Sequence, residues 1–268
     1  MKIPLYQIDA FTNQVFKGNP AAVCPLEKWL DDEMLQDIAA ENNLSETAYF
    51  VASGNQYELR WFTPKTEVDL CGHATLASAF VIFEHVKPSL AAVDFSTRSG
   101  VLRVERDGPR LAMDFPSRPA SNCTAPQNLL DALKVQPREV LLSRDYLVIY
   151  ETEEIIRSLQ PDMSLLEKVD CLGTIVTAPG GRADFVSRFF APRAGIPEDP
   201  VTGSAHCTLV PYWSRRLAKK DLHALQVSRR GGELFCRDNG DRVRIAGHAV
   251  QYLFGHIQTQ GFTKRGRL

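Results

Sequence analysis

The chain has 268 residues, of which 44% are hydrophobic, so it is long enough for two folded domains with full cores. Lys and Arg number 31 and Asp and Glu number 32, and the resulting net charge of -1 gives no support to binding of nucleic acid or a membrane surface. No apolar run approaches the roughly 20 residues of a membrane span, and no secretion signal is recognisable at the start, so we expect a cytoplasmic protein.

The first third of the chain predicts strands and two helices. Strands are expected at residues 5–11, 21–24, 47–51 and 57–62, and a helix with regular apolar spacing at residues 31–42. Residues 72–86 predict a second helix, which is apolar nearly all round and should therefore be buried. Three consecutive strands follow, at residues 93–95, 101–105 and 111–115.

The second half begins after residues 116–126, a segment with three prolines that predicts a linker. Helices are expected at residues 129–133, 164–169 and 203–217, and strands near residue 140, at 174–178, at 185–190 and in several steps through 225–259. The last helix contains Pro211, which must kink it or leave a tolerated gap in its hydrogen bonds. The basic residues 264–267 are expected to be a frayed terminus.

Each half is therefore mostly strands around one central helix, which indicates an α+β fold with barrel-like, mostly antiparallel sheets. We place the domains at residues 1–118 and 119–268, and the last strand could pack back on the N-terminal domain. The six cysteines show no CxxC spacing and no Cys/His spacing typical of zinc, so free thiols and no metal site are expected.

One sequence phrase occurs twice. RWFTPK at residues 60–65 precedes an acidic loop and then CGHAT at 71–75, while RFFAPR at 188–193 precedes a similar loop and TGSAH at 202–206. A duplicated strand, loop and helix suggests two similar domains. Their two helix N-termini could face each other across a cleft and hold an anion such as a carboxylate.

Three side chains near these phrases could carry chemistry. Glu46 lies at the entrance of a buried strand, where a partly desolvated carboxylate suits general acid/base work. His73 lies in the first turn of a helix, whose positive end favours a neutral imidazole, and Asp199 lies in the second acidic loop. Taken alone, each has a structural explanation: a solvated or capping Glu46, a helix-closing His73 and a turn-forming Asp199.

Four ordered motifs give the chain a resemblance to a known family. DAFT at residues 9–12 with GNPAAV at 18–23, NLSET at 43–47, DLCGHAT at 69–75 and EDPVTGSAH at 198–206 resemble the phenazine-biosynthesis isomerase family (PhzF-like), of the diaminopimelate-epimerase-like fold. The resemblance runs nearly end to end. It implies two pseudo-symmetric domains, each a barrel-like sheet around a central helix, with the active site between them.

In the phenazine enzyme a glutamate moves a proton between two carbons of dihydro-3-hydroxyanthranilate. The resemblance implies that Glu46, His73 and Asp199 are catalytic here. It implies substrate-binding groups at Asn19, Ser45, Cys71, Gly72, Thr202, Gly203 and Ser204. It further implies a homodimer, a small carboxylate-bearing substrate, and no metal or organic cofactor.

One departure concerns Cys71, a position where the phenazine enzyme lacks a cysteine. In epimerases of this fold two cysteines flank the substrate carbon, whereas here Thr202 occupies the second position. We therefore expect a cofactor-independent isomerase that uses Glu46. The alternatives are a non-enzymatic protein that binds a small acid or a partner, and an epimerase that uses Cys71 with a base other than a thiol.

Overall fold

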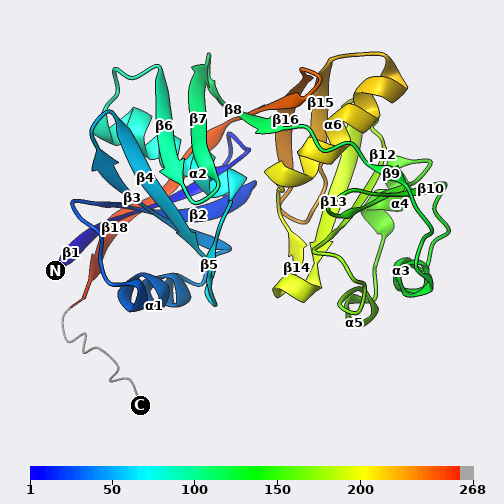
Figure 1. The fold of residues 1–268 in the computed structure, drawn as a ribbon, viewed down its shortest axis with the longest axis horizontal. Helices are drawn as coiled ribbons and strands as arrows, with labels where there is room; N and C mark the ends of the chain where they lie inside the picture. Colours follow the sequence, from blue (N-terminus) through cyan, green and yellow to red (C-terminus); the bar gives the residue numbers. More distant parts are fainter. Residues whose placement is uncertain (260–268) are drawn as a thin grey trace.

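The computed structural model describes residues 1–259 and shows two lobes side by side, each with strands curved around a buried helix (Figure 1). The basic residues 264–267 lie outside the described residues. Across residues 1–259, no helix combines the length and the apolar composition that crossing a membrane would require.

The first lobe contains the elements up to β8. Its strands are β1 (Lys2–Ala10), β2 (Asn19–Leu26), β3 (Glu46–Ser53), β4 (Gln56–Phe62), β5 (Glu67–Val68), β6 (Ala92–Thr97), β7 (Gly100–Asp107) and β8 (Arg110–Pro116). Its helices are α1 (Asp32–Asn42) and α2 (Gly72–Val81), which continues as a π-helical turn η1 (Ile82–Val86).

The second lobe contains more short elements. Its strands are β9 (Ser121–Asn122), β10 (Glu139–Leu142), β11 (Tyr146–Ile149), β12 (Thr174–Pro179), β13 (Phe185–Ala191), β14 (Ile196–Asp199), β15 (Asp221–Gln226), β16 (Gly232–Asp238) and β17 (Arg242–Gly247), and β18 (Ala249–Gln258) follows. Its helices are α3 (Gln127–Leu133), α4 (Glu153–Ser158), α5 (Met163–Leu166), the 3-10 turn η2 (Pro192–Ala194) and α6 (Gly203–Leu217).

The two lobes pair their strands in the same order. In the first lobe β1, β2, β3, β4, β6, β7 and β8 are neighbours, and successive pairs run antiparallel, parallel, antiparallel, parallel, antiparallel and antiparallel. In the second lobe β10, β11, β12, β13, β15, β16 and β17 repeat this series of orientations. Parallel neighbours need a crossover, and α2 and α6 lie within the equivalent crossovers from β4 to β6 and from β13 to β15. The sequence repeat is therefore a repeat of topology, and the predicted fold class is confirmed.

Each lobe is completed by a strand that follows the other lobe in the chain. β9 follows β8 but pairs with β10, and β18 follows β17 but pairs with β1 from Lys2 to Ala10. β8 and β17 are themselves antiparallel neighbours, so they join the two sheets. These pairings connect the lobes through backbone hydrogen bonds and leave little freedom for them to rotate against each other.

The sequence patterns do not predict some of the short helices and strands. The sequence does not predict α4, β5, β9, β11 or β14, and the helix expected at residues 164–169 is confined to Met163–Leu166. These segments are only two to six residues long, too short to show a period, and their conformation depends on the strands beside them.

Both central helices are buried, as their composition predicts. In α2 the buried residues include His73, Thr75 and Ser78. The hydroxyls of Thr75 and Ser78 donate hydrogen bonds to the backbone carbonyls of Cys71 and Ala74, one turn earlier. In α6, Pro211 has no N–H for the carbonyl of Cys207, and this oxygen accepts a hydrogen bond from the backbone N–H of Arg118 at 2.9 Å instead. The connection between the lobes thus satisfies the carbonyl that Pro211 leaves free.

Candidate active site

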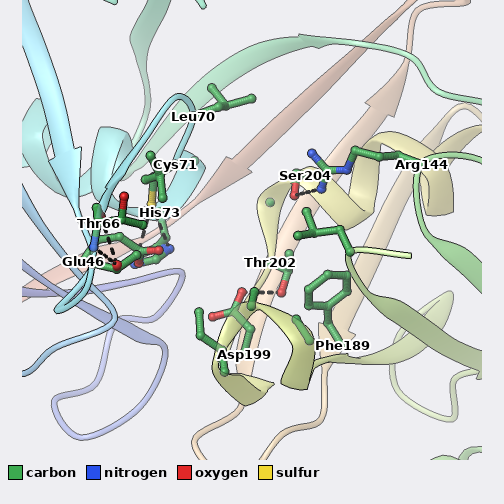
Figure 2. A pocket seen from close by; sticks show the side chains of 18 of the residues that line it. Glu46, Thr66, Leu70, Cys71, His73, Arg144, Phe189, Asp199, Thr202 and Ser204 are labelled. Atoms are coloured by element: carbon green, nitrogen blue, oxygen red, sulfur yellow. Dashed lines mark hydrogen bonds and ion pairs between the residues drawn. The ribbon is translucent and has the colours of Figure 1, made fainter. Parts of the chain in front are cut away.

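A cavity of about 370 Å³ lies between the lobes (Figure 2). Its walls combine eight of the site residues predicted from the sequence with a larger apolar surface. The sequence-predicted residues that line it are Glu46, Cys71, Gly72, His73, Asp199, Thr202, Gly203 and Ser204. The apolar walls come from both lobes and include Val68, Leu70, Phe115, Leu172, Phe189 and Ile196. A small molecule with an apolar body and a few polar groups fits such a cavity.

The two central helices begin at this cavity and nearly touch. A β-carbon added to Gly72 would lie 3.8 Å from Cα of Gly203, and one added to Gly203 would lie 3.9 Å from Cα of Gly72. Both N-termini present unpaired N–H groups and the positive end of a helix dipole. The expected facing arrangement is therefore present, and it concentrates partial positive charge at one end of the cavity.

Glu46 and His73 form an ion pair in this cavity. Glu46 begins β3, His73 lies in the first turn of α2, and Oε2 and Nε2 are 3.0 Å apart with both side chains buried. Burial lowers the pKa of an imidazole, yet the pKa of His73 is raised well above its ordinary value by the anionic forms of Cys71 and Glu46. Burial also raises the pKa of Cys71 to about 11, so the thiol keeps its proton and Glu46 is the effective partner. Glu46 thus favours the protonated form of His73 against the effect of burial, whereas the helix end favours the neutral form that was expected from the sequence.

Asn19 connects the two lobes behind the cavity. Its side-chain Nδ2 donates to Oδ1 of Asp199 at 2.7 Å and to the carbonyl of Val201 at 3.0 Å, and it lies 3.2 Å from Nδ1 of His73. Asn19 is fully buried and does not line the cavity. These contacts suit a positioning role, and the substrate contact that the resemblance implied stays a prediction.

Asp199 ends β14 and is partly exposed to the cavity. Its Oδ2 accepts a hydrogen bond from the Thr202 hydroxyl, across the loop that leads into α6. Burial raises the pKa of Asp199 to about 6, with a further contribution from Glu46, against the opposing effects of His73, Thr202 and Asn19. Asp199 therefore exchanges its proton close to neutral pH, as an acid/base group can.

Gln226 holds this loop in place, and the sequence did not predict it as a site residue. Its buried amide donates to the carbonyl of Asp199 at 2.9 Å and accepts from the backbone N–H of Thr202 at 2.8 Å. A glutamine at the end of a strand carries no distinctive pattern. Only its position beside the Asp199 loop reveals its function.

Arg230 holds the N-terminal motifs in place. Its guanidinium donates to Oδ1 of Asp9 and to the carbonyls of Lys17 and Gly18, each at 2.8 Å. Gly18 has φ 63°, and a β-carbon there would lie 2.1 Å from the carbonyl oxygen of Ala10, so only glycine fits. This turn delivers Asn19 to the interface between the lobes.

Two cations at the cavity were not singled out from the sequence. Lys65, from the first copy of the repeated phrase, lines the cavity, whereas its counterpart Arg193 pairs with Asp170. Arg144 lies over the start of α6, with Nη2 3.3 Å from the Ser204 hydroxyl (Figure 2). Ser45, a predicted binding residue, is only partly buried and does not line the cavity.

Comparison with known proteins agrees with this architecture. The family described as "Phenazine biosynthesis-like protein" matches residues 8–255. An uncharacterized isomerase of Pseudomonas aeruginosa is 52% identical over 257 residues, which cover 96% of this chain and 99% of that protein. A solved PhzF family structure from Enterococcus faecalis is 46% identical with a TM-score of 0.94, over 96% of this chain and all of that one.

A more distant solved structure shares the fold. A hydroxyproline epimerase from Agrobacterium vitis has a TM-score of 0.61 at 9% identity, over 96% of this chain and 92% of that one. The two-lobed architecture thus extends beyond close relatives to epimerases, as the diaminopimelate-epimerase-like fold prediction requires.

The facing helix ends predict stabilisation by anions. A small aromatic carboxylate such as benzoate should raise the melting temperature more than sulfate does, because the apolar walls add burial to charge. A ligand at 100 times its Kd contributes about 2.7 kcal/mol. In Gly203→Val the branched side chain enters the contact with Gly72 and Phe11, and the anion-dependent shift in thermal unfolding should disappear.

Gly203→Ala is the matched control, because its β-carbon would lie 3.8 Å from Phe11 and 3.9 Å from Gly72, at ordinary contact distance. It should fold normally and keep part of the shift. A folded Gly203→Val protein with the full anion-dependent shift would mean that the anion binds elsewhere.

Asp199 predicts a pH-dependent effect on stability. Its pKa rises from 3.8 to about 6 on folding, so the folded protein holds this proton more tightly than the unfolded chain does. The stability that protonation contributes is full below pH 3.8 and is lost as the pH rises through about 6. Relative to wild type, Asp199→Asn should therefore gain thermal stability as the pH rises through this window.

Thermal unfolding of both proteins below and above the window measures this change. Asp221→Asn, which removes an exposed carboxylate on β15, controls for the general loss of a negative charge. If Asp199→Asn differs from wild type by the same amount at every pH, Asp199 does not titrate as described.

Proposed function

This chain belongs to the phenazine biosynthesis-like protein family, and on that basis we propose that it is an isomerase that moves a proton within a small carboxylate-bearing metabolite, without a cofactor. The observation that carries the proposal is the buried pair of Glu46 and His73 beside two facing helix N-termini. The helix ends suit the carboxylate of the substrate, and the pair suits proton transfer next to it.

Substrate binding follows from the polarity of the cavity. The substrate carboxylate accepts hydrogen bonds from the first N–H groups of α2 and α6, near Gly72 and Gly203. The apolar walls, such as Leu70 and Phe189, contact the body of the substrate and exclude water. This orientation brings a carbon close to the bound carboxylate within reach of Glu46.

The reaction needs one proton carrier and no change of oxidation state. Glu46 removes a proton from one carbon, the double bond of the substrate shifts, and Glu46 returns the proton to another carbon. His73 keeps its own proton and stabilises the Glu46 carboxylate. The negative charge that develops on the substrate is stabilised by the helix ends, which are oriented before the substrate arrives.

The two alternatives have less support. An epimerase that uses Cys71 needs a thiolate, but the pKa of Cys71 is raised to about 11 by burial, with Glu46 adding to the effect, and Thr202 takes the place of a second thiol. A protein that only binds a small acid has no use for Glu46 and Asp199, because two carboxylates beside the ligand weaken anion binding.

We also propose a homodimer, in line with the resemblance noted from the sequence. Exposed aromatic side chains lie on β18 and on the loop after β1, namely Phe16, Tyr252 and Phe254, and Leu253 of β18 is exposed as well. The rings of Phe16 and Tyr252 are 5.4 Å apart, and the Phe16 backbone has φ 70°, an unfavourable value for phenylalanine. Exposed aromatic side chains that contact each other, such as Phe16 and Tyr252, suit burial against a second copy of the chain.

A cytoplasmic location is part of the proposal. All six cysteines lie within the described residues and are free thiols. Free thiols suit a reducing compartment, where disulfides are rare.

Glu46→Gln tests the proposed reaction. A panel of small unsaturated and amino carboxylates is incubated in D₂O with the wild-type protein, and deuterium in the recovered compounds is measured by mass spectrometry. A substrate should gain deuterium at carbon during turnover, and Glu46→Gln should lower the rate by about 10²–10⁴-fold while it still binds the compound. Glu41→Gln, on the exposed side of α1, is the control and should match wild type. An unchanged rate in Glu46→Gln would remove Glu46 from the mechanism.

Substitution of the exposed aromatic side chains tests the dimer. The pair Phe16→Asp and Phe254→Asp should convert a dimer into a monomer, because two charges would be buried between the copies. Val101→Asp, an equally exposed apolar residue on β7, should leave the dimer intact. Sedimentation analysis measures the mass of each species, and a wild-type monomer at high concentration would contradict the proposal.

A further inference from the structure

Arg144 brings a guanidinium group to the cavity from the second lobe. It lies in the short loop between β10 and β11, and Figure 2 shows its side chain reaching over the start of α6 toward the cavity. Nε and Nη2 each lie 3.3 Å from Oδ2 of Asp145, and Nη2 also lies 3.3 Å from the hydroxyl oxygen of Ser204. Among residues 1–259, none accepts a hydrogen bond from Nη1. One nitrogen of the guanidinium is therefore available to a ligand.

Asp145 holds this guanidinium in place. The Asp145 side chain is 3% exposed and does not line the cavity, whereas the Arg144 side chain is 37% exposed and does. The lost hydration of a buried carboxylate largely cancels its attraction to a cation, so such a pair adds little stability. Its main consequence is positional, because an arginine in a surface loop would otherwise rotate freely. The pair thus keeps Arg144 beside the cavity before any ligand binds.

The acidic residues that line the cavity have partners other than Arg144. Glu46 pairs with His73 at 3.0 Å, and Asp199 accepts a hydrogen bond from Asn19 at 2.7 Å. The helix ends suit one carboxylate of a ligand. Arg144 is thus an additional cation that no acidic side chain lining the cavity neutralises.

We propose that the substrate carries a second carboxylate, which binds to Arg144 and Ser204 while the first carboxylate lies at the helix ends. The Ser204 hydroxyl accepts a hydrogen bond from Nη2, so its own proton is free to be donated to a ligand. Nη1 and this hydroxyl then donate to the two oxygens of one carboxylate. The ligand class is therefore a small dicarboxylic acid with an apolar body. The inference rests on the proposed function, which places the first carboxylate and supplies the reaction.

Lys65 also lines the cavity, but it is less well prepared to bind a second carboxylate. Its Nζ would lie 3.4 Å from a β-carbon on Gly195, so it reaches the second lobe, yet no acidic side chain within residues 1–259 pairs with it. A flexible ammonium that nothing holds loses more side-chain freedom on binding than a guanidinium that is already held. The second carboxylate is therefore assigned to Arg144.

Affinities for monocarboxylates and dicarboxylates test the inference without any turnover. The full-length protein is titrated calorimetrically with benzoate and with phthalate, isophthalate and terephthalate, which hold two carboxylates at three different spacings. At least one dicarboxylate should bind at least ~10-fold more tightly than benzoate, because hydrogen bonds between charged groups add to the affinity. Arg144→Gln should bind benzoate as the wild type does and should lose the advantage of the dicarboxylate.

Two further variants control for charge and for folding. Arg193→Gln removes the same charge from a residue that pairs with Asp170 and does not line the cavity, so it should keep the wild-type affinities. Arg144→Gln leaves the buried Asp145 without its ion-pair partner, which can destabilise the protein. The double variant Arg144→Gln with Asp145→Asn removes both charges and should show the same loss of the dicarboxylate advantage.

The inference is overturned if no dicarboxylate binds more tightly than benzoate to the wild type. It is also overturned if Arg144→Gln weakens benzoate and the dicarboxylate by the same factor, because Arg144 would then bind the first carboxylate. Loss of the advantage in Lys65→Gln but not in Arg144→Gln would assign the second carboxylate to Lys65 instead. The deuterium experiment decides the isomerase reaction separately. A protein that shows the expected affinities but exchanges no deuterium would retain the dicarboxylate site and lose the proposed reaction.

Discussion

The meeting of two helix N-termini at Gly72 and Gly203 is the constraint on which the rest of the structure depends. Two ends of the same partial charge repel each other, and they lie nearly in contact. The two helix ends are held together despite this repulsion, because β9 and β18 are exchanged between the lobes and β8 pairs directly with β17. Backbone pairing along the sheets thus maintains an electrostatic arrangement that an anionic ligand would relieve.

The polar groups around this point form a connected series across both lobes. Glu46 pairs with His73, Asn19 lies between His73 and Asp199, and Gln226 fixes the loop that carries Asp199. The series explains why the proton affinities differ from those of isolated side chains. His73 responds to a carboxylate, while Asp199 responds mainly to loss of water.

Much of this could be predicted from the sequence, because the repeated phrases mark equivalent helix starts and the apolar runs mark buried elements. Local patterns could not reveal contacts between distant residues, such as Arg230 with Asp9 or Arg118 with the carbonyl of Cys207. The direction in which the His73 pKa shifts could not be predicted for the same reason: the helix start is visible in the sequence, but the proximity of Glu46 is not. The repeat also hides a difference, since Lys65 lines the cavity and its counterpart Arg193 does not.

A crystal structure with a small aromatic carboxylate such as benzoate would test the central claim most directly. The account predicts that the carboxylate lies at the junction of α2 and α6, with its oxygens within hydrogen-bond distance of backbone N–H groups near Gly72 and Gly203. The ring should then contact the apolar walls, with Glu46 beside it. A carboxylate bound to Lys65 or Arg144 with the helix ends unoccupied would contradict the account.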